Sequence, residues 1–351
     1  FSFEFSHFEE GIVTPENQSA LPLARFTLFR YLVILDHFHD RGSILYNSFE
    51  PAVKRDSEFR ELLRFNQASD LPFELTGEEK TSVSETDFIS LVHQAKMHIH
   101  RGDVFQLVVS RPFEQAFFGD DFQVYRQLRQ LNPSPYLFYL DMESYRLFGS
   151  SPETQIRLQN GVAEIHPIAG TVRKTGDSQL DQLLIQQLIS DEKENAEHTM
   201  LVDLARNDLS KFCTSVKIAS YKEVQHFSHV THLVSKVKAN THATPLSLFN
   251  GTFPAGTPGG IPKPKALELL TRYEPCMRGF YGGAVGFIHP NGNMNLAIII
   301  RSAFSSDNTL RYQAGAGIVL DSIPENELEE VNNKLGAMRK AIRCASNPTT
   351  L

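Results

Sequence analysis

Apolar and polar positions alternate in many short runs of this chain, which is the pattern of strands that bury one face. Turn residues such as Asn160-Gly161 separate several of these runs. The pattern predicts strands at residues 25–29, 31–35, 104–110, 136–140, 145–148, 154–158, 162–166, 216–220, 230–237, 280–288, 295–303 and 310–318. Neighbouring strands joined by short turns predict large antiparallel sheets.

Helical periodicity occupies stretches between these strands. Ser84 and Asp87 have the spacing of a capping box, and the helix that they begin is expected to end at Gly102-Asp103. Further helices are predicted at residues 122–131, 180–205 and 262–270, and a last one after Pro324, with an apolar stripe of Leu328, Val331, Leu335, Met338 and Ile342. The fold class is therefore α+β. We expect an N-terminal strand-rich part, residues 1–75, that belongs to the same fold as a main region at residues 84–345.

Composition excludes several classes of protein. The 351 residues carry a formal net charge of −7, which argues against non-specific nucleic-acid binding. No apolar run approaches the roughly 20 residues of a membrane-spanning helix. The three cysteines form no close-spaced pair, which favours a reducing, cytoplasmic location over a disulfide framework. Because the chain begins at Phe1 without a signal-like segment, we interpret its start as a truncation.

Two pairs of glutamates stand out on predicted helices. Glu194 and Glu197 are three residues apart, as are Glu327 and Glu330, and Lys334 follows four residues later. This spacing places each set on one helical face. Two such pairs suit a hard divalent cation, above all Mg²⁺, which takes oxygen ligands. Two solvated acidic faces explain the same spacing and are the more common case, so both interpretations stay open at this point.

Other motifs point to anion binding or fail as known sites. Gly315-Ala316-Gly317 ends a strand where backbone amides can approach an anion, although tight sheet packing explains it equally well. Arg301 follows three isoleucines, and a buried arginine needs a charged partner such as a carboxylate. His226, His229 and His232 have no cysteine nearby, so a zinc site is not favoured. The chain also lacks the cysteine elbow of a glutaminase.

An ordered series of motifs resembles the chorismate-utilising enzymes, and among them the large synthase component of anthranilate synthase. The resemblance runs from about Ser84 to Ile342. The matching segments are Gly102-Asp103-Val104-Phe105-Gln106, Gly149-Ser150-Ser151-Pro152-Glu153, His166-Pro167-Ile168-Ala169-Gly170-Thr171, residues 191–198, residues 200–208, Thr252-Phe253-Pro254-Ala255-Gly256-Thr257 and residues 313–319. It implies two large antiparallel sheets packed face to face with outer helices, and an active site in a cleft.

The resemblance also assigns roles to individual residues. It implies that Glu197 and Glu330 bind Mg²⁺ directly, with Glu194 and Glu327 close by or acting through water. Glu153 would be the general acid for the departing C4 hydroxyl, and His232 would assist pyruvate elimination. Gln106 and Thr171 complete the expected catalytic group. The expected substrate-binding residues are Ala169, Gly170, Thr257, Tyr281, Arg301, Gly315, Gly317 and Lys334.

Two positions separate the subfamilies. Isochorismate and salicylate synthases carry a water-activating lysine where this chain has Gln106, so ammonia is the expected nucleophile. Aminodeoxychorismate synthases often carry a lysine where this chain has Ala169. The resemblance therefore implies that the chain makes anthranilate and pyruvate from chorismate and ammonia, the first committed step of tryptophan biosynthesis. A separate glutamine amidotransferase subunit would supply the ammonia. The alternatives are an aminodeoxychorismate synthase component and a catalytically silent chorismate-binding paralogue.

Overall fold

The computed structural model describes residues 1–9, 11–12, 21–48, 61, 64, 71–226 and 230–347; for residues 8, 9, 171, 173 and 193 it describes only the backbone. The chain divides into two compact units. Ala24–Leu71 form one, and Phe1–Leu23 together with Pro72–Leu351 form the other. The expected division at residues 1–75 and 84–345 stays a prediction, but the contacts of Phe1–Leu23 are with the later part of the chain.

The described part of the smaller unit contains one antiparallel hairpin. Its strands are β1 (Tyr31–Asp36) and β2 (Arg41–Tyr46), and most of their side chains are exposed. Residues 25–29, although described, form no strand, so that prediction was wrong. A strand there would need a pairing partner, which the local pattern of apolar residues does not provide.

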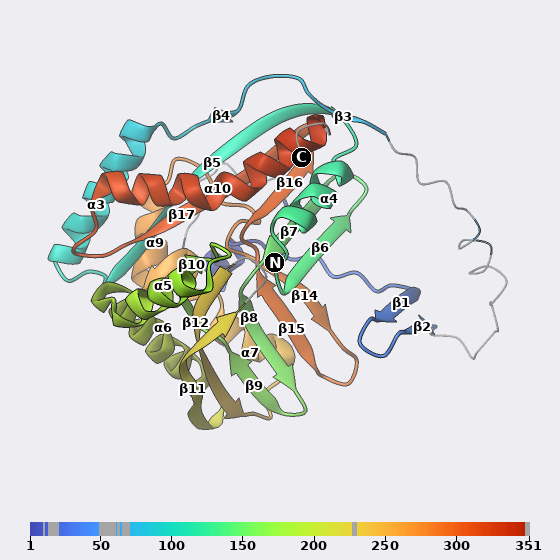
Figure 1. Cartoon of the computed structure of the whole chain (residues 1–351). Coiled ribbons are helices and arrows are strands. Elements are labelled where there is room, and N and C mark those ends of the chain that lie inside the picture. Colours follow the sequence, from blue (N-terminus) through green and yellow to red (C-terminus); the bar gives the residue numbers. More distant parts are fainter. Residues whose placement is uncertain are drawn as a thin grey trace. The chain divides into compact units, whose positions relative to one another are not determined.

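The larger unit contains two large antiparallel sheets (Figure 1). One has eight strands within the described residues, in the order β13-β5-β17-β16-β7-β6, with β3 and β4 also paired to β5. These strands are β3 (Phe73–Leu75), β4 (Lys80–Thr81), β5 (Gln106–Gly119), β6 (Tyr136–Asp141), β7 (Arg146–Ser151), β13 (Gly260–Ile261), β16 (Ser302–Ser306) and β17 (Thr309–Ile318). The strands β16 and β17 are joined by the two-residue turn Asp307-Asn308, whose φ angles are 50° and 55°. Positive φ at both positions is the geometry of a type I′ hairpin.

The second sheet has seven strands in the described part of the chain, in the order β10-β12-β9-β8-β15-β14, with β11 paired to β12. They are β8 (Thr154–Gln159), β9 (Val162–Ile165), β10 (Ile168–Arg173), β11 (Thr214–His226), β12 (Val230–Asn240), β14 (Ala284–Ile288) and β15 (Met294–Ile298). The strand predicted at 295–303 is therefore two strands, one in each sheet, because the chain leaves the second sheet after Ile298 and joins the first at Ser302.

Helices cover the outside of the sheets (Figure 1). They are α1 (Phe5–Glu9), α3 (Glu85–His100), α4 (Phe122–Leu131), α5 (Ser178–Ser190), α6 (Glu192–Ser210), α7 (Pro245–Thr252), α8 (Gly256–Gly259), α9 (Lys263–Tyr273) and α10 (Pro324–Ser346). The predicted fold class, α+β with two large antiparallel sheets and outer helices, is confirmed. None of the helices that the structure describes combines the length and the apolar character needed to cross a membrane.

The predicted helix at residues 180–205 is two helices. Asp191 ends α5 with φ −68° and ψ 117°, an extended conformation, and its side chain caps α6 by accepting from Glu194 N at 2.9 Å. An aspartate that offers its carboxylate to the next backbone turn competes with continued helix. Glu194 and Glu197 consequently lie in the first two turns of α6 rather than in the middle of a long helix.

Candidate active site

Within the described residues the chain passes between the two large sheets four times, and two of these passages carry the predicted site residues Glu153 and Arg301. Glu153 lies between β7 and β8, and Arg301 lies between β15 and β16. Backbone hydrogen bonds join the two passages, from Ile298 N to Glu153 O at 3.0 Å and from Ser150 N to Arg301 O at 3.1 Å. Two residues far apart in sequence are therefore held at the same junction of the sheets.

The Glu153 carboxyl group is buried, with only 6% of the residue exposed. Burial raises its pKa to about 7, and a hydrogen bond from Thr257 and the charges of Arg301 and Lys334 oppose that rise. The hydrogen bond runs from Thr257 Oγ1 to Glu153 Oε1 at 2.7 Å. A carboxyl group with this pKa holds a proton at neutral pH and below, which suits a general acid.

His232 lies on β12, and the charge of Arg301 acts on its imidazole as well. Its Nδ1 donates to the backbone oxygen of Gly170 at 3.0 Å, because a carbonyl oxygen only accepts. Burial lowers the pKa of the imidazole; the bond to Gly170 raises it and the charge of Arg301 lowers it again. His232 is thus a neutral imidazole near pH 7, with its basic lone pair on Nε2.

Arg301 occupies an unusual backbone conformation. Its φ angle of 52° lies in the left-handed region, which non-glycine residues seldom adopt. Its positive charge acts on both Glu153 and His232, which places the guanidinium within electrostatic reach of both groups. An unusual backbone conformation in a cation whose charge acts on both a buried acid and a buried imidazole is typical of a functional site.

A second set of predicted residues lies along β17 and α10. Lys334 Nζ donates to Gly315 O at 2.9 Å and forms an ion pair with Glu330 Oε1 at 2.7 Å. The backbone of Gly315 hydrogen bonds to the Tyr281 hydroxyl, and burial raises the pKa of Tyr281 to about 12. Since Lys334 also acts on Glu153, these residues belong to one electrostatic neighbourhood with Arg301 and His232.

Three glycines of the predicted site allow close approaches that a side chain would block. A Cβ atom at Gly315 would stand 2.7 Å from Val109 O, and one at Gly317 would stand 2.6 Å from Gln106 Nε2. Gly170 has φ +67°, and a Cβ there would meet Leu188 at 2.3 Å and Glu194 Oε2 at 3.3 Å. The contact at Gly170 brings Glu194 next to the residue that holds His232.

Comparisons with known proteins agree with this arrangement. The sequence profile of the family described as "chorismate binding enzyme" matches residues 1–340. This chain belongs to that family. Anthranilate synthase component 1 of Aquifex aeolicus is 44% identical over 270 residues, which cover 76% of this chain and 55% of that protein. The same component of Acetivibrio thermocellus is 38% identical over 358 residues, 96% of this chain and 72% of that protein.

A solved structure is also similar. Anthranilate synthase component I from Streptococcus pneumoniae superposes with a TM-score of 0.86 at 34% identity, and the match covers 96% of this chain and 78% of that one. This chain thus spans only part of the length of these family members, little more than half in the Aquifex case.

The family's expected metal ligands lie on two helices. Glu194 and Glu197 are partly buried on α6, Glu327 is 2% exposed on α10, and Glu330 is paired with Lys334. An all-carboxylate donor set fits the chemistry of Mg²⁺. Among the residues that the structure describes, however, no group of three or more His, Cys, Asp or Glu side chains is placed to hold a metal ion. The Mg²⁺ site stays a prediction.

The backbone of β10 places two further predicted residues. Ala169 and Thr171 lie on β10, opposite Leu233 and His232 of β12, and the ladder shifts register between them at Gly170. This irregularity turns the Gly170 carbonyl towards His232. The side chain of Thr171 and the whole of His229 lie outside the described part of the chain, and His226 bonds to Thr231 through Nδ1 at 3.1 Å.

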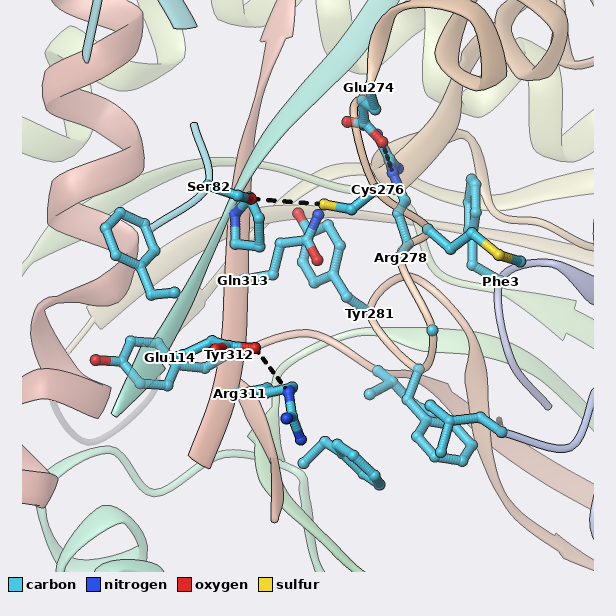
Figure 2. A pocket seen from close by; sticks show the side chains of 18 of the residues that line it. Phe3, Ser82, Glu114, Glu274, Cys276, Arg278, Tyr281, Arg311, Tyr312 and Gln313 are labelled. Atoms are coloured by element: carbon cyan, nitrogen blue, oxygen red, sulfur yellow. Dashed lines mark hydrogen bonds and ion pairs between the residues drawn. The ribbon is translucent and has the colours of Figure 1, made fainter. Parts of the chain in front are cut away.

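A large cavity lined by described residues lies beside Tyr281 (Figure 2). It measures about 910 Å³, and Phe3, Glu274, Arg278, Arg311 and Gln313 help to line it. Of the predicted site residues, Tyr281 alone is among its described lining residues. The site implied by the family resemblance and this cavity therefore share Tyr281 but are not the same place.

Sequence reasoning missed a buried ion pair at this boundary. Arg278 is 6% exposed and donates from Nε to Glu274 Oε2 at 2.7 Å. The two residues are four apart, but they follow the end of α9, so helical spacing offered no reason to pair them. A charged residue next to Gly279 and the aromatic residues Phe280 and Tyr281 was the available signal, because such a position predicts burial and a buried charge needs a partner.

Proposed function

We propose that this chain is the synthase component of an anthranilate synthase, which converts chorismate and ammonia into anthranilate, pyruvate and water. The observation that carries the proposal is Glu153, a buried carboxyl group with its pKa raised to about 7 at the junction of the two sheets. The similarity of most of the chain to anthranilate synthase components supports it.

In the first half of the proposed reaction, Glu153 gives its proton to the C4 hydroxyl group of chorismate. Hydroxide is a poor leaving group, so a positioned acid lets the group depart as water. Ammonia adds at C2 and loses a proton to become an amine. Gln106, buried beside Gly317, has no basic group with which to activate a competing water molecule.

In the second half, Nε2 of His232 accepts the C2 proton. The C3–oxygen bond then breaks, the ring becomes aromatic, and the enolpyruvyl group leaves and takes up a proton to become pyruvate. A neutral imidazole suits this step, and burial keeps the pKa of His232 below its usual value.

Positive and polar groups around the junction would bind the substrate's two carboxylates. Arg301 and Lys334 supply charge close to Glu153, and the Tyr281 hydroxyl lies next to Gly315. Glu197 and Glu330 would hold Mg²⁺, with Glu194 and Glu327 near them. When bound, the ion supplies a positive centre for the ring carboxylate.

Ammonia would come from a separate glutamine amidotransferase subunit, since the sequence contains no glutaminase-type cysteine elbow. The chain alone should use ammonium salts and not glutamine. We place the reaction in the cytoplasm, which agrees with the free thiols of Cys213, Cys276 and Cys344.

The deciding experiment incubates the purified chain with chorismate, Mg²⁺ and ammonium chloride. Fluorescent anthranilate should form with one pyruvate for each turnover. A product that keeps its enolpyruvyl group, detected by mass spectrometry of the quenched reaction, would assign the chain to the aminodeoxychorismate synthases instead. Binding of chorismate without any product would favour the catalytically silent paralogue, and turnover of glutamine by this chain alone would contradict the two-subunit arrangement.

A further inference from the structure

We propose that Arg278 and Glu274 are positioning residues of this reaction: their buried ion pair fixes the loop that carries Thr257 and the part of β5 that faces Gly315 and Gly317. The inference rests on the proposed function, and it gives a role to two residues that the motifs leave out.

The ion pair is bidentate, and the guanidinium of Arg278 also donates hydrogen bonds to two backbone oxygens. Arg278 donates from Nε and from Nη2 to the two carboxylate oxygens of Glu274, each at 2.7 Å. Its Nη2 also donates to Val108 O at 2.6 Å, and its Nη1 donates to Pro258 O. One face of the guanidinium lies over the Phe3 ring, with Cζ 4.6 Å from the ring centroid. Only the planar fork of arginine can reach these four oxygens at once.

On one side, the pair is attached to β5 directly opposite the site glycines. Glu274 Oε1 accepts from Ser110 N at 3.0 Å and from Ser110 Oγ at 2.6 Å, while Arg278 holds Val108. In the β5–β17 ladder, Ser110 is the partner of Gly315 and Val108 is the partner of Gly317. The ion pair therefore determines the position of the backbone against which both glycines lie.

On the other side, the pair is attached to the loop beside the proposed general acid. Pro258, whose carbonyl accepts from Arg278, directly follows Thr257, whose hydroxyl donates to Glu153. Both residues belong to α8, which has only four residues and no side-chain N-cap. So short a helix has little stability of its own, so a contact from outside has to hold it in place.

A disturbance of Arg278 should consequently be felt at Glu153. If the loop moves, Glu153 loses the hydrogen bond from Thr257. That bond favours the carboxylate form, so its loss raises the pKa of Glu153 further. The acid keeps its proton to higher pH but is no longer held at the leaving oxygen.

The experiment compares Arg278→Lys, Thr257→Val and the double variant. Arg278→Lys should lower kcat about 100-fold, since a displacement of about 1 Å has that effect, with a smaller change in KM for chorismate. In wild type, kcat should fall at high pH because Glu153 loses its proton. The pH at which this alkaline decline (the alkaline limb) begins should be higher in both single variants. The double variant should show no larger move than Thr257→Val, because both changes remove the same hydrogen bond. Because the fraction of free ammonia changes with pH equally for all proteins, kcat of each variant is divided by kcat of wild type at the same pH.

Arg339→Lys is the matched control. Arg339 also makes a bidentate pair, with Glu79 at 2.8 and 2.7 Å, and also lies over an aromatic ring, that of Phe113 at 4.6 Å. Its partners Glu79, Asn332 and Phe113 do not belong to the Thr257 loop, so the pH at which kcat falls should stay unchanged. An unmoved limb in Arg278→Lys, or additive shifts in the double variant, would overturn the proposal.

Two further measurements keep the test decisive. If circular dichroism shows that Arg278→Lys is unfolded, Glu274→Gln replaces it, because glutamine keeps one acceptor oxygen for the guanidinium. The same shift of the alkaline limb of kcat to higher pH is expected. Absence of that shift counts against the proposal. If wild type makes no anthranilate, the proposed function fails, and carbon-13 NMR titration of Glu153, assigned with Glu153→Gln, still tests the pair. Arg278→Lys should raise that pKa, and an unchanged pKa contradicts the positioning role.

Discussion

The large cavity beside Tyr281 and the sheet junction at Glu153 differ in several properties by which an active site is recognised. The large cavity has a volume of about 910 Å³ and includes the half-exposed ion pair of Arg311 and Glu114. The hollow beside Glu153 and Thr257 has only about 30 Å³, room for about one water molecule. The large cavity is the default site by volume. The small hollow is lined by the buried acid Glu153, on which the charge of Arg301 acts.

The difference teaches that a buried carboxyl group with a raised pKa, and not empty volume, marks the proposed chemistry, since the buried Arg278 and Glu274 of the cavity side neutralise each other. An ion pair open to water contributes little and perturbs little. A carboxyl group at the sheet junction loses its hydration, so its proton affinity rises into the range that acid catalysis needs. The proposed function places the chemistry at the junction, and substitutions in the two regions should test this.

The largest effect is expected from Glu153→Gln. Glutamine preserves the shape of the side chain but has no proton to give, so the rate of anthranilate formation should fall by about 10²–10⁴. The wild-type rate per free ammonia should decline above pH 7, where Glu153 loses its proton, and this limb should vanish in the variant. Fluorescence of anthranilate measures both. Near-normal activity of Glu153→Gln would move the chemistry away from the junction.

A smaller but more selective effect is expected from His232→Asn. Asparagine can donate to Gly170 O but cannot accept the C2 proton, so pyruvate release should slow by about 100-fold, more than amination. The aminated intermediate should accumulate and be visible by mass spectrometry. Equal slowing of both steps would show that His232 only shapes the site.

The metal prediction comes next in magnitude. Glu197→Gln and Glu330→Gln should each weaken Mg²⁺ binding by at least about tenfold, and calorimetry with Mg²⁺ alone measures this without turnover. Glu114→Gln, on the cavity side, is the control and should leave the affinity unchanged. Activity that survives EDTA would remove Mg²⁺ from the mechanism.

The variants Gly315→Ala and Gly317→Ala should differ in thermal stability. Gly315→Ala places a Cβ 2.7 Å from Val109 O, a backbone atom that has little freedom to move, and should cost about 1–3 kcal/mol of unfolding free energy. Gly317→Ala meets the end of the Gln106 side chain, which can rotate, and should cost less. Thermal unfolding of both variants decides the order, and equal losses would contradict this account.

The smallest effect is expected on the cavity side. Arg311→Gln removes an ion pair whose side chains are 42% and 50% exposed, so stability should change by less than about 1 kcal/mol. The rate of anthranilate formation should stay within about twofold of wild type, because surface changes of this kind have small effects. A loss approaching that of Glu153→Gln would make the cavity part of the catalytic region.

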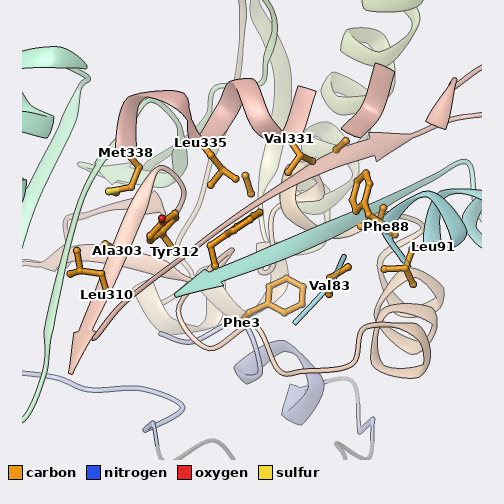
Figure 3. Packing of buried hydrophobic residues seen from close by; sticks show 14 of the residues in the cluster. Phe3, Val83, Phe88, Leu91, Ala303, Leu310, Tyr312, Val331, Leu335 and Met338 are labelled. Carbon is orange, nitrogen blue, oxygen red and sulfur yellow. The ribbon is translucent and has the colours of Figure 1, made fainter. Parts of the chain in front are cut away.

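Local patterns predicted the elements well where a local cause determines them. Ser84 and Asp87 form the predicted capping box, and α4 begins and ends at the predicted residues. The apolar stripe of α10 packs on the sheet, with Val331, Leu335 and Met338 facing strand residues (Figure 3). The pattern missed β10 and the continuation of β5 beyond Ser110, because pairing with distant strands determines both.

The site was much less predictable from local pattern. Glutamate spacing left Mg²⁺ and a solvated surface both open, and the family resemblance supplied the roles. That Glu153 and Arg301 meet depends on two passages between sheets, which no spacing of 148 positions in the chain can indicate. The Arg278–Glu274 pair was missed because it follows the end of α9, and its further contacts with Val108 and Pro258 depend on the tertiary fold.

The turn Asp307-Asn308 has a consequence for how this sequence can change length. Its two residues set the register in which Ser306 faces Thr309, and the same ladder carries on to β17 and β5. Inserting or deleting one residue there would slide β17 by one position and exchange Gly315 and Gly317 with Ala314 and Ala316 across the faces of the sheet. Substitutions elsewhere in the hairpin leave that alignment intact. Natural variants of this hairpin should therefore differ by replacement and keep its length, whereas β1 and β2, which among the described residues pair only with each other, should tolerate changes of length at their ends.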